Sequence, residues 1–159
     1  MNGFSKPIAV ASADAMHQLG HALAAQLVAG DVVYLSGPLG AGKTTLAQAI
    51  VRGLGFSGRV KSPSYGLIEL YPINGLTVVH LDLYRLSAAE EVADLGLEAY
   101  TTAGTADKAD TVMLIEWPSR GEGHLPPASW VVEIEDGPGV FGVASQPVTT
   151  DRRVTVSRR

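Results

Sequence analysis

Cysteine is absent from this chain of 159 residues, which excludes disulfides, thiolate zinc sites and iron–sulfur clusters. No stretch approaches the ~18 apolar residues of a membrane span, and no apolar run of signal-peptide length follows the amino-terminus. Excess positive charge is also missing: the formal net charge is −4, whereas tight binding to a nucleic acid normally needs a basic face. We therefore expect a cytoplasmic protein that has no contact with a membrane and does not bind RNA tightly by itself.

The composition is that of one folded domain. The apolar content is 46% and the charged content 18%, as in ordinary globular proteins. No internal repeat, low-complexity tract or linker divides residues 1–120, so we expect a single domain over residues 1–159. From about residue 151 the chain is rich in arginine, and we expect this end to be a flexible, solvated tail.

Hydrophobic periodicity predicts alternating helices and strands. Helices are expected from Ser12 to about Val28 and from Thr44 to Arg52. A third is expected to open at a capping box, Ser87 to Glu90, and to end near Gly96. Strands are expected at Asp31–Leu35, Gly66–Leu70, Leu76–Leu83, Thr111–Ile115, Trp130–Glu135 and Arg153–Val156, with a long connection from Gly137 to Pro147. This order predicts a three-layer α/β domain with a mixed sheet that is antiparallel at one edge.

The segment from Gly37 to Thr44 has the pattern G-x-x-x-x-G-K-T, and it follows a predicted strand and opens a predicted helix. In that context the pattern indicates a P-loop NTPase fold. Gly40 and Gly42 permit the backbone N–H groups to point at phosphates, Lys43 can reach the β- and γ-phosphates, and the Thr44 hydroxyl suits Mg²⁺. We expect a nucleoside triphosphate to be bound by Leu39, Gly40, Ala41, Gly42, Lys43, Thr44 and Thr45.

Such a site also needs an acidic residue at a strand end, because phosphate oxygens and one hydroxyl do not complete the shell of Mg²⁺. Glu116 and Asp82 each end an apolar strand pattern. We assign Glu116 to the metal and Asp82 to a metal-bound or attacking water, with Lys43 as the third catalytic residue. The chemistry alone does not rank the two acids, and either one is also suited to capping a helix or pairing with Arg85. His80 alternates with apolar residues, so we interpret it as a core or supporting residue and leave it out of the site.

Two further features have both functional and structural interpretations. The segment from Lys61 to Tyr65 lies where many NTPases have a loop that senses the γ-phosphate, but a surface turn fits equally well. Trp117, beside Glu116, is suited to stacking on the nucleotide base or a partner, or to packing in the core.

Taken together, these residues resemble the TsaE (YjeE) family of small bacterial ATPases over roughly Ser12 to Leu125. The resemblance rests on the order and spacing of four blocks: Gly-Pro-Leu-Gly-Ala-Gly-Lys-Thr-Thr from Gly37, Val-Lys-Ser-Pro-Ser-Tyr from Val60, His-Leu-Asp-Leu-Tyr-Arg-Leu from His80, and Ile-Glu-Trp-Pro from Ile115. It implies that Leu39 to Thr44 bind ATP, that Thr44 and Glu116 hold Mg²⁺, and that Asp82 serves hydrolysis. Family members also place a late arginine near the nucleotide, and Arg152 is the nearest match.

The resemblance further implies an accessory role in threonylcarbamoyl modification of adenosine 37, in tRNAs that read codons beginning with A. The modification chemistry would belong to a TsaD–TsaB pair, and tRNA would be met only through that pair. ATP hydrolysis by the isolated chain would be weak, since the partner would complete or reset the site.

Three other functions use similar loops. A small-molecule or nucleotide kinase would need an acceptor pocket and usually an arginine-bearing lid, and no lid insertion is evident. A small GTPase would need an Asn-Lys-x-Asp motif, which is absent. A nucleotide-binding regulator with incidental hydrolysis is not separable from a partner-activated ATPase by sequence.

Overall fold

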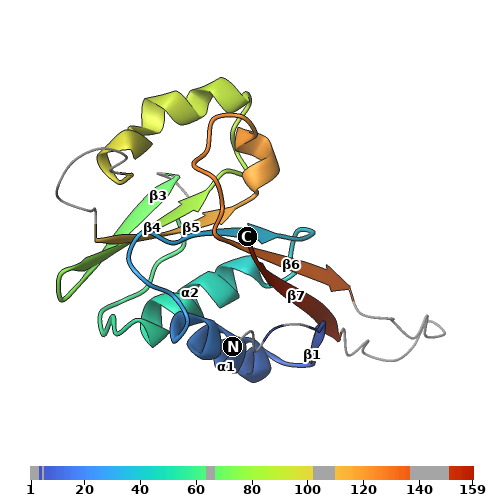
Figure 1. Ribbon diagram of the computed structural model, residues 1–159. Coiled ribbons are helices and arrows are strands. Elements are labelled where there is room, and N and C mark those ends of the chain that lie inside the picture. Colours follow the sequence, from blue (N-terminus) through green and yellow to red (C-terminus); the bar gives the residue numbers. More distant parts are fainter. Residues whose placement is uncertain (1–3, 5, 64–66, 102–109, 137–150) are drawn as a thin grey trace.

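A seven-stranded sheet forms the middle layer of the part of the chain that the structure describes (Figure 1). This computed structural model describes residues 4, 6–63, 67–101, 110–136 and 151–159. The strand order is β1-β7-β6-β2-β5-β4-β3. The strands are β1 Ile8–Val10, β2 Val32–Ser36, β3 Ile68–Ile73, β4 Leu76–Asp82, β5 Thr111–Glu116, β6 Trp130–Asp136 and β7 Arg152–Arg158.

The four central strands, β6, β2, β5 and β4, are mutually parallel. Antiparallel strands flank them on both sides, because β6 pairs with β7, β7 with β1, and β4 with β3. The predicted mixed α/β sheet with an antiparallel edge is therefore confirmed, and a second antiparallel edge lies on the other side of the parallel strands. The short strand β1, which the sequence did not indicate, forms the outer edge beside β7.

The strand predicted at Arg153–Val156 is confirmed as part of β7, and the expectation of a flexible tail from about residue 151 is wrong. Strand β7 lies between β1 and β6, where Arg152 pairs with Asp136 and Val156 with Val132. Val154 and Val156 are buried, because they alternate with residues that point away from the core. Their burial outweighs the solvation of the arginines and fixes the segment in the sheet.

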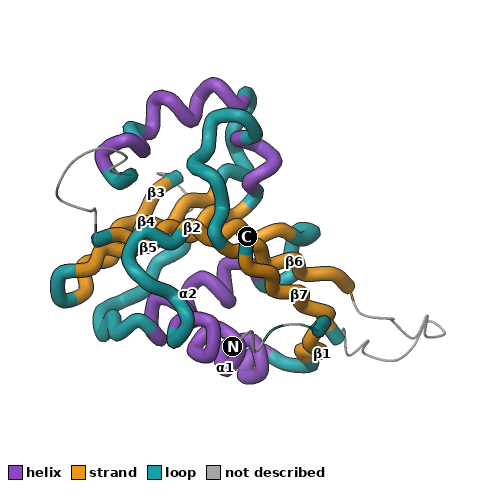
Figure 2. The backbone as a smooth tube through the Cα atoms, viewed as in Figure 1, coloured by secondary structure: helices purple, strands orange, loops and turns teal. Residues whose placement is uncertain are grey.

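Helices cover the two faces of the sheet unequally (Figure 2). On one face lie α1 (Ala13–Ala24) and α2 (Lys43–Gly53), which share a hydrophobic cluster with β2 and β6. On the other lie three 3₁₀-helical segments: η1 Ala89–Leu95, η2 Leu97–Ala99 and η3 Pro118–Gly121. Residues of η1 and η2 share a second cluster with β4 and β5. No helix in the described ranges has the length and apolar character needed to cross a membrane.

Local signals explain most helix boundaries. The Ser12 hydroxyl accepts a hydrogen bond from the backbone N–H of Ala15 at 3.1 Å, which caps α1. The predicted capping box at Ser87 is not formed: η1 starts after Ala88, and the Ser87 N–H instead donates to the carboxylate of Glu91. Gly96, in a left-handed conformation at φ 65°, ends η1 as predicted.

The two α-helices pack closely against each other at Gly20. A Cβ atom at Gly20 would lie only 2.3 Å from the Cβ of Ala49 on α2. The glycine is therefore required by packing, despite its low helix propensity.

We expect Gly20→Ala to lower the free energy of unfolding by about 1–3 kcal/mol, because overpacking exceeds the gain in helix propensity. Chemical denaturation measures this change. Ala49→Gly added to Gly20→Ala removes the clash and should recover part of the loss. A Gly20→Ala protein as stable as the wild type would contradict the close approach of α1 and α2.

Candidate nucleotide-binding site

The phosphate loop connects β2 to α2, as the sequence predicted. Gly40 and Gly42 have φ of 76° and 103°, in the left-handed region that favours glycine. Helix α2 begins at Lys43, so the free N–H groups of its first turn and the positive end of its dipole lie at the loop. This is the local geometry that binds phosphate groups.

A cavity of about 270 Å³ lies over this loop. It is lined by Leu39, Gly40, Ala41, Gly42, Lys43, Thr44, Thr45, Asp82, Tyr84, Glu116 and Trp117. Of the predicted site residues, only Arg152 is not among them. Tyr84 was missed, although its position two residues after Asp82 was a usable signal, since alternate residues of an extended chain point the same way.

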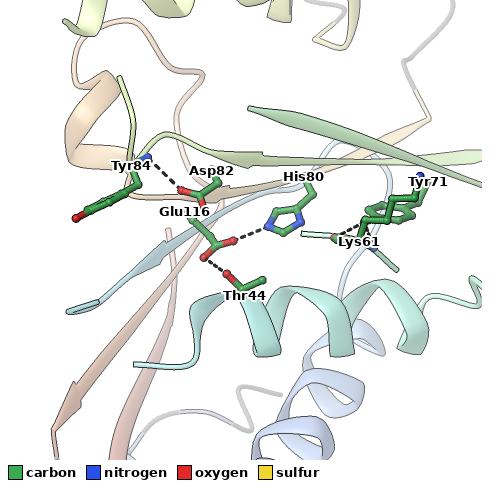
Figure 3. Close-up of polar contacts among 7 residues, drawn as sticks. All are labelled: Thr44, Lys61, Tyr71, His80, Asp82, Tyr84 and Glu116. Carbon is green, nitrogen blue, oxygen red and sulfur yellow. Dashed lines mark hydrogen bonds and ion pairs between the residues drawn. The ribbon is translucent and has the colours of Figure 1, made fainter. Parts of the chain in front are cut away.

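Both predicted acids lie where neighbouring parallel strands end. Asp82 of β4 is paired with Glu116 of β5 in the register of the sheet, so the two carboxylates lie on the same face. The Thr44 hydroxyl donates to Glu116 Oε1 at 2.8 Å, which joins the phosphate loop to β5 (Figure 3). Asp82 accepts a hydrogen bond from the Tyr84 N–H at 3.1 Å and also caps a local turn.

His80, which the sequence analysis left out of the site, contacts Glu116 directly. Its Nε2 lies 2.7 Å from Glu116 Oε2, and both residues are buried (Figure 3). The strand register explains this contact: His80 is paired with Leu114, so its ring lies diagonally from Glu116 on one face of the sheet. The two-residue spacing from Asp82 was a signal for that shared face.

The amine of Lys43 is held inside the loop. Lys43 Nζ donates to the carbonyl oxygens of Gly37 at 2.7 Å and Pro38 at 2.8 Å, and it lies 4.2 Å from the centre of the Trp117 ring. Trp117 is therefore at the lysine end of the cavity, and its ring also packs on Tyr84 at 5.0 Å. Its left-handed backbone, at φ 56°, is strained for a bulky residue. Contact between Trp117 and a base stays a prediction.

Burial shapes the electrostatics of the cavity. It lowers the pKa of Lys43, and the carboxylates of Glu116 and Asp82 oppose that effect by favouring the charged amine. Burial also raises the pKa of Asp82, against the hydrogen bond from the Tyr84 N–H. The charged forms of Lys43 and Asp82 are thus each less stable in the protein than they would be in water. A ligand of complementary charge would offset this loss of stability.

Arg152 lies beside the loop and outside the cavity lining. Its guanidinium forms an ion pair with Asp136 and donates through Nη2 to the carbonyl oxygen of Gly40 at 3.1 Å. The carboxy-terminal strand is therefore connected to the phosphate loop. A direct contact between Arg152 and nucleotide stays a prediction.

The segment that starts at Lys61 is only partly described, because Ser64 and Tyr65 lie outside the described residues, as do Gly66 and the predicted connection from Gly137 to Pro147. The Tyr71 hydroxyl fixes its beginning by accepting from the Lys61 N–H and donating to the Lys61 carbonyl oxygen. A second cavity, of about 140 Å³, is lined by Pro63, Leu67, Asp82, Tyr84 and Arg85. The described part of the segment thus adjoins the site at Asp82.

A solved structure resembles most of this chain. The crystal structure of YdiB from Bacillus subtilis matches with a TM-score of 0.68 and 26% sequence identity, covering 95% of this chain and 82% of that one.

Curated proteins and a family model agree. The tRNA threonylcarbamoyladenosine biosynthesis protein TsaE of Haemophilus influenzae is 45% identical over 65% of this chain, and this chain spans 62% of its length. The protein of that name from Streptomyces coelicolor is 43% identical, over 69% of this chain and 70% of its own length. The one from Synechocystis is 38% identical, over 76% of this chain and 74% of its own length. The family model for threonylcarbamoyl adenosine biosynthesis protein TsaE matches residues 10–139. With its phosphate loop and both strand-end acids inside that range, the chain belongs to the TsaE family.

Proposed function

We propose that this chain is a magnesium-dependent ATPase that assists the threonylcarbamoyl modification of adenosine 37 in tRNA. The observation that supports it most is the hydrogen bond from Thr44 to Glu116, which brings the phosphate loop and a strand-end acid together in one cavity. Membership of the TsaE family supplies the pathway. A TsaD–TsaB pair would be the partner in the cytoplasm, and the net charge of −4 favours contact with tRNA only through that pair.

Phosphate binding would fall to α2 and Lys43. The first-turn N–H groups of α2 and the loop backbone offer donors to the β- and γ-phosphates. The Lys43 amine, now satisfied by the carbonyl oxygens of Gly37 and Pro38, would turn toward the phosphates and exchange neutral acceptors for charged ones.

The donor set fits Mg²⁺. Thr44, Glu116 and Asp82 present hard oxygen atoms to the cavity, as Mg²⁺ requires. Among the described residues no group of three or more His, Cys, Asp or Glu side chains is arranged to hold a metal unaided. This suits an ion that keeps waters and substrate phosphates in its shell. When bound, Mg²⁺ would neutralise charge on the β- and γ-phosphate oxygens.

Hydrolysis would use Asp82. Its carboxylate lines the cavity close to Lys43, and burial raises its pKa, which makes it a better proton acceptor than an exposed aspartate. It would orient the water that attacks the γ-phosphorus, while ADP leaves and the water's proton passes to the carboxylate or to phosphate. With Lys43 held by the loop carbonyls and Trp117, the resting site suits weak turnover that a partner raises.

The cavity of about 140 Å³ beyond Asp82 favours one alternative, a small-molecule or nucleotide kinase, because an acceptor would have to lie on that side. We expect ATP turnover by the purified chain to be slow and to rise when a TsaD–TsaB pair is added. Release of ADP is measured with and without the pair, and with a panel of acceptor metabolites. Release that depends on an acceptor and not on the pair would replace the ATPase proposal with a kinase.

We expect Lys43→Ala to weaken ATP binding by about 10- to 100-fold, because it removes a charged hydrogen-bond donor to phosphate. Glu116→Gln should bind ATP as the wild type does in EDTA, but the increase in ATP affinity on adding Mg²⁺ should be about tenfold smaller. Isothermal titration calorimetry in both conditions separates the two effects. Lys6→Ala, at an exposed position, is the control and should bind as the wild type does. Equal losses for Lys6→Ala and Lys43→Ala would argue against the loop as the phosphate site.

We expect Asp82→Asn to raise the melting temperature of the nucleotide-free protein at neutral pH. Because its pKa is raised on folding, Asp82 stabilises the folded protein most below its ordinary pKa, and this contribution is lost as pH rises through the raised value. The amide that replaces the Asp82 carboxyl in the variant does not ionise and avoids that loss. The difference in melting temperature between the variant and the wild type should therefore shrink as the pH falls from about 8 to 4. Thermal melts across this range test it, with the exposed Asp94→Asn as control. An advantage that grows toward acid pH would have the wrong sign.

A further inference from the structure

The Glu116 side chain is enclosed by protein donors on both of its oxygens. Oε1 accepts from the Thr44 hydroxyl at 2.8 Å, and Oε2 lies 2.7 Å from His80 Nε2. Glu116 is only 1% exposed, so water does not reach it freely. A buried carboxylate oxygen without a donor is costly, and for Oε2 the donor among the described residues is His80.

The hydrogen in this contact belongs to the imidazole, because a carboxylate oxygen only accepts. His80 Nε2 therefore donates, and Nδ1 is left as the second ring nitrogen. Nδ1 is buried and has no hydrogen-bond partner among the described residues. An apolar side chain on this strand would avoid that cost, so packing alone does not account for a histidine here.

Each oxygen of the Glu116 carboxylate has a different partner. With Oε2 held by His80, rotation of the Glu116 side chain is restricted and Oε1 is directed at Thr44 on α2. Without His80, Oε2 would seek another donor, and Oε1 would leave the line to the Thr44 hydroxyl. Removing a group that orients a metal-binding carboxylate commonly lowers metal affinity by about 10- to 100-fold.

We propose that His80 is a positioning residue for magnesium: its Nε2–H holds Glu116 Oε2, so that Oε1 alone is presented to Thr44 and to the metal or its water. This inference rests on the proposed binding of ATP and Mg²⁺. It assigns His80 to the coupling between metal and nucleotide, and not to contact with the nucleotide itself.

The first test compares ADP affinity, by isothermal titration calorimetry, in EDTA and in saturating Mg²⁺. For His80→Leu we expect wild-type affinity in EDTA and a gain from Mg²⁺ that is smaller by about tenfold. His80→Gln, whose amide keeps an N–H donor at similar reach, should restore most of the gain. Val78→Ala is the matched control: it lies on the same strand face and is fully buried, so it lowers stability without removing a donor.

A full Mg²⁺ gain in folded His80→Leu, or an equal loss in Val78→Ala, would overturn the inference while leaving the proposed function intact. Wild-type protein whose ADP affinity ignores Mg²⁺ would overturn the proposed function and the inference together. The magnesium-dependent shift in melting temperature gives the same comparison without calorimetry.

The second test needs no binding and no defective variant. Long-range proton–nitrogen NMR of the wild-type protein reports which ring nitrogen of each of the four histidines carries hydrogen. The His80 signal is assigned by its disappearance in His80→Gln. Hydrogen on Nε2 is the expected result, and an Nε2 without hydrogen would overturn the inference.

Discussion

The site depends on one buried carboxylate, that of Glu116, which lies between the sheet and α2. Thr44 donates to it from the helix and His80 contacts it from the neighbouring strand, so three elements meet at one side chain. Burial makes these contacts necessary, because a carboxylate removed from water must be satisfied by protein donors. The same contacts fix the end of β5 relative to the phosphate loop. The proposed nucleotide, if it uses both, would therefore meet a geometry that is already set.

The register of β4 and β5 makes this arrangement possible. Parallel pairing sets Asp82 opposite Glu116 and His80 opposite Leu114, so the three polar side chains share the face covered by α2. A shift of one residue would turn His80 and Asp82 toward the opposite face, among the apolar residues packed against η1 and η2. Residues such as Val79 and Leu81, buried on that face, resist the shift because they would become exposed to the polar site. Apolar packing on one face of the sheet thus fixes the positions of the polar site residues on the other face.

The site is built at some cost to stability. Lys43, His80 and Glu116 are buried polar residues, and burial disfavours the charged forms of Lys43 and Asp82. The strained backbone of Trp117 lies in the same place. Elsewhere the fold is regular: Gly20 permits close helix packing, and β7 pairs with both β6 and β1. Concentrating unfavourable features around one cavity is typical of binding sites, since a ligand can offset them.

The sequence by itself determined the phosphate loop, because the spacing from Gly37 to Thr44 and its place between a strand and a helix are local properties. A nucleoside triphosphate as its ligand stays a prediction. The sequence also identified Asp82 and Glu116, since each ends an apolar run. It did not identify His80 or Tyr84 as site residues. For the carboxy-terminal end it predicted both a strand at Arg153–Val156 and a flexible tail, and it did not place β7 between β1 and β6. Those features depend on which strands are neighbours and in what register, and many residues separate the partners in sequence: His80 meets Glu116, and Arg152 meets Gly40. Only the tertiary structure decided them, because pairing between distant strands is set by burial of the whole sheet and not by local propensity.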